Sequence, residues 1–201
     1  MSYASGGLIE ATDYNTLVGG NPVTSSGKLN TVWATGGSTA GYGQTALANV
    51  SVGQTVAASE WADLVNKTAN AASHQGTSIT SVTAPATGGT ITYLSAVPTN
   101  LTTIYTSRLN ASSQGTTTSN TATRSGTWSA ALTFTHTATF ANGDAARYFF
   151  NSGGQLAITC SHPSGSGIDL LLNNLASNVG TVVISSPSSG SITVSSTSYN
   201  G

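Results

Sequence analysis

The chain has 201 residues, of which only five are basic and six are acidic, so charged residues make up 5% and the formal net charge is −1. Soluble domains usually carry about 25% charged residues. The sequence therefore offers no basic stripe for nucleic acid, no cationic helix for an anionic membrane, and little material for acid–base or metal chemistry. Apolar residues make up 38%, which is enough for a folded core.

The N-terminal third contains a weak duplication, because residues 8–18 recur as residues 55–65. Three matching positions are identical, and Tyr14 corresponds to Trp61. Each copy predicts the start of a helix, with a hydroxyl N-cap followed by an acid that faces the positive helix end. The N-caps are Thr12 and Ser59, the acids are Asp13 and Glu60, and the second helix is predicted over residues 59–73.

Composition changes divide the rest of the chain. Residues 28–50 lie between the two copies and are rich in glycine. A proline and a glycine pair interrupt residues 77–90, which are therefore predicted as a connector. We expect an N-terminal docking segment with short helices and Gly-rich loops at residues 1–76, and a β-rich α+β domain at residues 91–201.

The clearest periodic pattern lies in residues 128–140. Even positions there are apolar apart from His136, whereas the odd positions from Thr133 onward are threonine. This alternation predicts a long strand with one apolar face and one hydroxyl face. Threonine-rich residues 116–124 are predicted as its hairpin partner, and the hydroxyl faces are expected to meet solvent or a neighbouring subunit.

The other elements of the second domain are short. Apolar residues at helical spacing between cap residues and glycine stops predict helices, and β-branched runs predict strands. We therefore expect an antiparallel sheet covered on one side by short helices. The predicted helices are residues 98–109, residues 143–150 with Asn142 as N-cap, and residues 167–179 before Gly180; the predicted strands are residues 90–94, 156–160, 181–185 and 191–195.

Two details concern the end of the chain. The alternation of Cys160 with Leu156 and Ile158 predicts a buried, unreactive strand thiol. Asn200-Gly201 is a dipeptide typical of tight hairpins, yet no returning strand follows it. We therefore expect the chain to be the N-terminal part of a longer polypeptide.

Residues suited to chemistry are sparse. The sequence has no Gly-x-Ser-x-Gly elbow, its three histidines share no metal-ligand spacing, and its carboxylates are too scattered to nominate a glycosidase pair. Asp144 and Arg147 stand at i, i+3, which is typical of a surface ion pair. We expect no catalytic residue, no metal ligand and no cofactor.

Three aromatic residues lie in Gly-rich irregular segments, namely Tyr3, Trp33 and Tyr42. Aromatic rings in such places anchor subunit interfaces or stack on sugars. We favour interface or local packing, because an assembly must bury its loops against neighbours.

Four segments carry a resemblance to a known class of proteins: residues 6–15 (GGLIEATDYN), 41–44 (GYGQ), 56–61 (VAASEW) and 140–154 (FANGDAARYFFNSGG). They resemble virion structural and tail fibre-like proteins of tailed bacteriophages, especially phages of cyanobacteria and other aquatic bacteria. The resemblance implies a homo-oligomer without a cofactor, which contacts other virion proteins in a particle assembled in the host cytoplasm.

These observations together predict a noncatalytic structural component of a phage particle, associated with the tail, baseplate or tail fibre. A head decoration or neck protein is the first alternative, and a carbohydrate-binding adhesin module that contacts a host surface glycan is the second. No apolar leader follows Met1 and no run approaches about 18 apolar residues, so we expect neither a signal peptide nor membrane insertion.

Overall fold

The computed structural model describes residues 10–20, 25–89, 95–113, 115–126, 133–163, 165–186, 191–194 and 197–200. Its helices are α1 (Ala11–Val18), α2 (Leu29–Trp33), α3 (Ala58–Gln75), α4 (Ala96–Thr106), α5 (Gly143–Asn151) and α6 (Ile168–Val179). Its strands are β1 (Gln155–Thr159), β2 (Thr181–Ser185), β3 (Ser191–Val194) and β4 (Thr197–Asn200).

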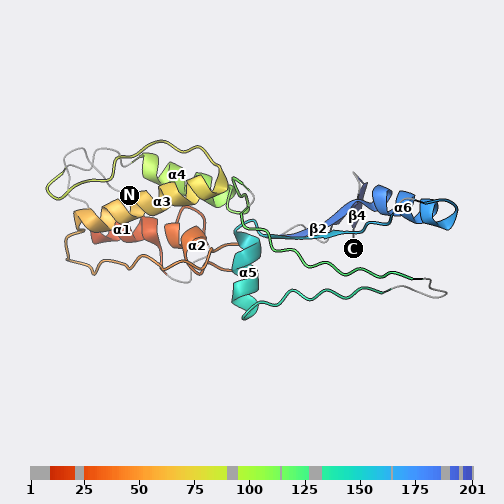
Figure 1. The fold of residues 1–201 in the computed structure, drawn as a ribbon. Helices are drawn as coiled ribbons and strands as arrows, with labels where there is room; N and C mark the ends of the chain where they lie inside the picture. Colours follow the sequence, from red (N-terminus) through yellow and green to blue (C-terminus); the bar gives the residue numbers. More distant parts are fainter. Residues whose placement is uncertain are drawn as a thin grey trace.

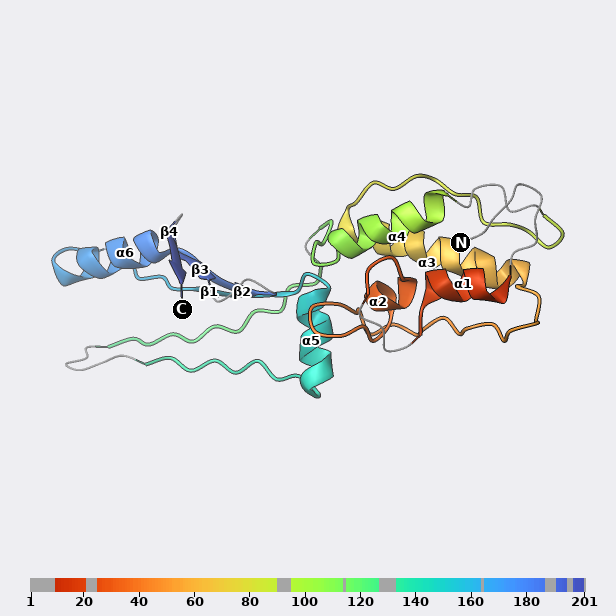
Figure 2. The same cartoon turned by 180° about the vertical axis from the view of Figure 1, so that it is seen from behind.

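The molecule is elongated (Figure 1). Helices α1 to α4 form a compact head at one end, which comprises the described residues 10–113. An arm projects from the head and comprises residues 115–126, 133–140 and 155–186, with α5 lying across the junction (Figures 1 and 2). All buried apolar side chains of the described residues belong to the head, so the two parts differ in how well they are packed.

The core of the head is built from helices at the expected spacing. In α3, Trp61, Leu64 and Val65 point inward, and the ring of Trp61 lies 6.4 Å from that of Tyr14 in α1. The two copies of the duplicated segment therefore contact each other through matching residues. The largest side chains of this core are Tyr14, Leu17, Leu29, Trp61, Leu64, Leu101 and Ile104.

Both predicted N-caps are wrong by two residues. The N-cap of α1 is Glu10 and that of α3 is Ala57, and neither side chain caps its helix. In α3 the backbone N–H of Ala57 donates to Oε2 of Glu60 at 2.7 Å. An acid three residues after the N-cap satisfies that N–H, so the helix starts earlier than a hydroxyl N-cap would predict.

The core continues past the segment predicted as a connector. Val97, Leu101 and Ile104 of α4 are buried in the same cluster as α1 and α3. Residues 77–86 cross the head between α3 and α4 without regular structure, and Thr80 there is held by Asn100. The division at residues 77–90 remains a prediction, but the packing of the head depends on residues from both sides of it.

The second half is α+β, but it is not β-rich, so that part of the prediction is wrong. Its described strands form two small antiparallel pairs, β1 with β2 and β3 with β4. In the first pair Gln155 lies opposite Ser185 and Thr159 lies opposite Thr181. Helix α6 joins these two strands, yet no residue of α6 is buried, so it does not cover the sheet.

The long threonine-lined strand is also absent from the described residues. Residues 115–126 and 133–140 run as extended chain along the arm, but neither belongs to a strand (Figure 1). Residues 127–132 and the predicted strand at residues 90–94 lie outside the described ranges. An extended segment becomes a strand only when another segment accepts and donates its backbone hydrogen bonds, and the described chain supplies none to residues 133–139.

Several shorter elements are confirmed. Asn142 caps α5 by accepting the N–H of Ala145 at 2.8 Å, and Gly180 ends α6 with a positive φ of 65°. Strands β1, β2 and β3 lie where they were predicted. The prediction that Cys160 is buried in a strand is wrong, because Cys160 is exposed and follows β1.

Candidate assembly surface

The most unusual feature of the molecule is the apolar surface of its arm. Of the eight large hydrophobic side chains that are exposed among the described residues, seven belong to the arm. Ile168 is 72% exposed and Leu171 is 67% exposed. Single exposed apolar residues are normal, whereas a concentration of them is typical of surfaces that contact other molecules. The seven residues are Phe134, Ile158, Ile168, Leu170, Leu171, Leu175 and Ile184.

The total accessible surface of the chain is larger than that of a compact protein of the same mass. The accessible surface is 12492 Å². A compact monomer of 20.1 kDa is expected to expose about 8,700 Å². The surplus of about 3,800 Å² exceeds the ~800 Å² that each partner buries in a standard protein–protein interface.

Helix α6 is amphipathic, which is typical of helices that pack one face against another surface. Most of its apolar residues gather in one stripe along the helix, whereas Leu170 lies on the other side together with Asn173, Asn174 and Ser177. Half of the stripe is partly covered and half is exposed. The partly covered residues are Leu172, Ala176 and Val179, and the exposed residues are Ile168, Leu171 and Leu175.

The arm carries almost no charge. Its only charged residues are Arg124 and Asp169, which have opposite signs. Copies of such a surface can approach one another without strong like-charge repulsion and without burying many unpaired ions.

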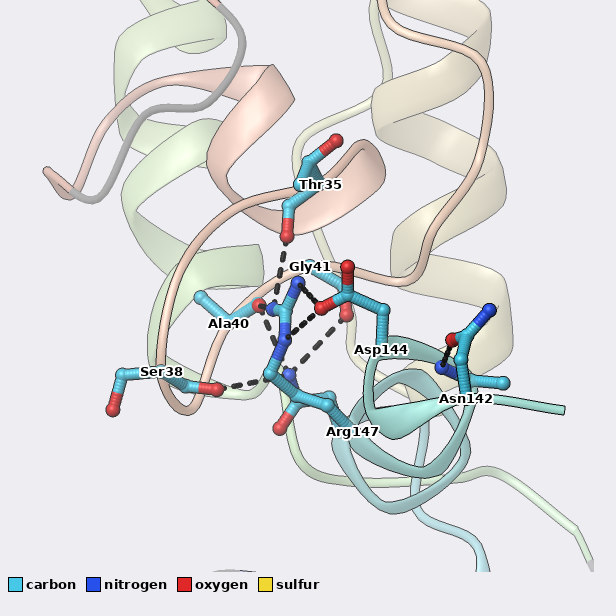
Figure 3. Close-up of polar contacts among 9 residues, drawn as sticks. Thr35, Ser38, Ala40, Gly41, Asn142, Asp144 and Arg147 are labelled. Carbon is cyan, nitrogen blue, oxygen red and sulfur yellow. Dashed lines mark hydrogen bonds and ion pairs between the residues drawn. The ribbon is translucent and has the colours of Figure 1, made fainter. Parts of the chain in front are cut away.

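Helix α5 fixes the arm to the head through Arg147. Its Nη1 donates to the backbone oxygens of Thr35 at 2.9 Å and Ala40 at 2.8 Å, so one guanidinium closes the loop at residues 35–40 (Figure 3). The predicted ion pair with Asp144 is confirmed, at 3.1 Å from Nη2 to Oδ1. The two carbonyl contacts were not predicted, because they join residues more than a hundred positions apart in sequence.

A second set of contacts completes this joint. Asn151 is buried, and its Nδ2 donates to the oxygen of Ala40 at 2.9 Å. At the end of α5, Nε2 of His74 lies 2.9 Å from the oxygen of Ser152, which links the end of α3 to the arm. Hydrogen bonds therefore connect the base of the arm to the head, whereas most side chains farther along the arm are exposed.

Trp33 and Tyr42, two of the three predicted aromatic residues, lie beside this joint. Nε1 of Trp33 donates to the oxygen of Thr45 at 3.0 Å. The Tyr42 hydroxyl donates to the oxygen of Arg108 at 2.7 Å and accepts from Gln75 at 2.8 Å. Burial raises the pKa of Tyr42 to about 12, although the hydrogen bond from Gln75 and the charge of Arg108 act in the opposite direction. Both rings thus make contacts within the chain, and Tyr3 lies outside the described residues.

The described ranges hold no set of three His, Cys, Asp or Glu side chains placed to bind a metal ion together. None of the helices in these ranges combines the length and apolar character needed to cross a bilayer. No known protein family, curated protein or solved structure matches this chain.

Proposed function

We propose that this chain is a noncatalytic structural component of a tailed-phage particle, which acts through contacts with its own copies and with other virion proteins. The observation that supports it most is the arm, which exposes seven large apolar residues, whereas the buried apolar side chains of the described residues lie in the head. Exposing such a surface to water is unfavourable, at about 25 cal/mol for each Å² of apolar area, so an assembled state that buries it is stabilised.

The elongated outline favours the tail, baseplate or tail fibre over a head decoration or neck position. An arm that projects from the head (Figure 2) and exposes large apolar side chains suits lateral packing along a projecting structure. The adhesin alternative receives less support from the aromatic residues. Trp33 and Tyr42 are partly buried against the core of the head, which leaves less of their ring faces free to stack on a sugar.

The oligomeric state of the purified chain tests the proposal. We expect light scattering during size-exclusion chromatography to give a mass of at least twice the 20.1 kDa of one chain. Leu171→Glu and Leu175→Glu place charges in the exposed apolar stripe and should shift the chain towards the monomer. Ser177→Glu lies on the polar side of the same helix and serves as the matched control. A wild-type chain that stays monomeric at all concentrations would contradict the proposal.

The position in the particle needs a separate experiment. Antibodies raised against the head should label intact particles at regular positions on the tail, baseplate or fibre in negative-stain images. Labelling of the capsid or neck would favour the alternative location. Glycan binding by the purified chain without any particle labelling would favour the adhesin.

A further inference from the structure

We infer that residues 118–126 and 133–140 become strands of a sheet formed between copies, in which the same two segments of a second copy supply the missing backbone partners. This inference rests on the proposed homo-oligomeric function and specifies how the arms associate.

The two segments have the geometry of strands without their hydrogen bonds. They run alongside each other in opposite chain directions in both views (Figures 1 and 2), and their residues are exposed apart from the half-buried Phe140. Residues 133–139 make no backbone hydrogen bond within the described chain. A lone two-stranded hairpin is marginal in water, whereas three or more strands with an apolar face are stable. A second pair of segments would supply the required strands.

The side chains of residues 133–140 suit pairing with an identical surface. Phe134 and Ala138 alternate with threonines, so a strand would have one face of hydroxyl groups and one face that is apolar apart from His136. Threonines opposite each other on neighbouring strands hydrogen-bond well. The chain already contains such a pair, since Oγ1 of Thr159 in β1 lies 3.1 Å from Oγ1 of Thr181 in β2.

These segments also lack the features that normally keep exposed strand edges apart. Proteins protect free edges with charged residues, prolines or bulges. Residues 133–140 contain no charged residue and no proline, and Arg124 is the one charged residue in residues 118–126. An uncharged, unprotected edge of this kind favours a second copy over a partner recognised by charge.

Amide hydrogen exchange of the full chain tests this pairing directly. At a concentration where light scattering finds the oligomer, amides of residues 133–139 should exchange on the order of 100-fold more slowly than unprotected amides. Dilution to the monomer should remove this protection. An oligomer in which these amides remain unprotected overturns the inference but leaves the proposed function standing. Protection that persists in the monomer also overturns it, because the pairing would then lie within one chain. A chain that never oligomerises overturns both.

Cysteine cross-linking gives an independent test. In a Cys160→Ser background, single cysteines replace Thr133, Thr135, Thr137 and Thr139 in turn, and the oligomer is oxidised. At least one variant should form a covalent dimer, because residues 133–140 of the two copies lie next to each other in the proposed sheet and matching positions then approach within disulfide distance. Val52→Cys, an exposed site on the head, is the matched control and should stay monomeric on a non-reducing gel. Equal cross-linking at Val52 and at the four threonine positions would overturn the inference.

Discussion

The side chain of Asn30 pairs with the backbone of Leu47 as a neighbouring strand would. Its Nδ2 donates to the oxygen of Leu47 at 2.9 Å, and its Oδ1 accepts the N–H of Leu47 at 3.0 Å. Asn15 holds Val50 and Asn100 holds Thr80 in the same two-way manner. Helices α1, α2 and α4 thus attach extended segments to the head with uncharged amides, which explains how this chain folds with so few charged residues.

Replacing Asn30 with alanine should destabilise the head strongly. Asn30 is fully buried, so Asn30→Ala leaves the N–H and the oxygen of Leu47 without partners and should lower the free energy of unfolding by about 2–4 kcal/mol. Asn66→Ala, at an exposed position of α3, should change it by less than about 0.5 kcal/mol. Urea unfolding measures both variants. Equal losses in the two would show that the pairing contributes little.

Replacing Arg147 should loosen the joint between arm and head. Arg147→Ala removes two hydrogen bonds from a cation to loop carbonyls, so the amides of α5 should exchange at least about tenfold faster. Arg147→Lys should resemble the alanine variant, because an ammonium lacks the planar fork that reaches both carbonyls and Asp144. Asp144 is 65% exposed, so Asp144→Ala should cost less than about 1 kcal/mol. Unchanged exchange in both Arg147 variants would contradict this role.

Replacing Gly41 tests whether the loop needs the backbone of Gly41 to lie close to the backbone of Thr35. A Cβ on Gly41 would lie 2.2 Å from the backbone oxygen of Thr35, and the φ of Gly41 is +96°. Gly53 has a similar φ of +86°, but a Cβ there would meet nothing within 4 Å. Gly41→Ala should therefore lower the free energy of unfolding by about 2 kcal/mol more than Gly53→Ala. Both substitutions strain the backbone, but only Gly41→Ala adds a steric clash. Matching thermal unfolding curves for the two variants would refute this explanation.

Stability should decline in alkaline solution because of two tyrosines. Burial raises the pKa of Tyr14 to about 12, with smaller contributions from the charges of Glu60 and Asp63, and burial also raises the pKa of Tyr42 to about 12. An unfolded tyrosine titrates near pH 10. Between about pH 10 and 12 the folded state therefore holds more protons than the unfolded state, so stability falls as the pH rises, whereas below about pH 9 this contribution is constant.

Urea midpoints measured from pH 8 to pH 11 check this dependence. Tyr14→Phe has no proton to lose at that position, so its midpoint should fall less steeply above about pH 10 than that of the wild type. Identical slopes would indicate that Tyr14 ionises in the folded protein as easily as in the unfolded chain.

The sequence by itself determined the local elements. The spacing of Trp61, Leu64 and Val65 located α3, Asn142 marked the start of α5, and Gly180 marked the end of α6. Helical hydrogen bonds join residues four positions apart, and caps act within one turn, so a short stretch of sequence contains all the information they need.

Only the tertiary structure decided what those elements contact. The alternation of residues 128–140 predicted a strand, but a strand requires a partner from elsewhere, and the described chain does not supply one to residues 133–139. Cys160 is likewise exposed, because the described residues do not cover the end of β1 where it lies. The contacts of Arg147 and Asn30 depend equally on distant segments. Which surfaces are buried is set by packing between such segments, and periodicity within one segment does not encode that packing.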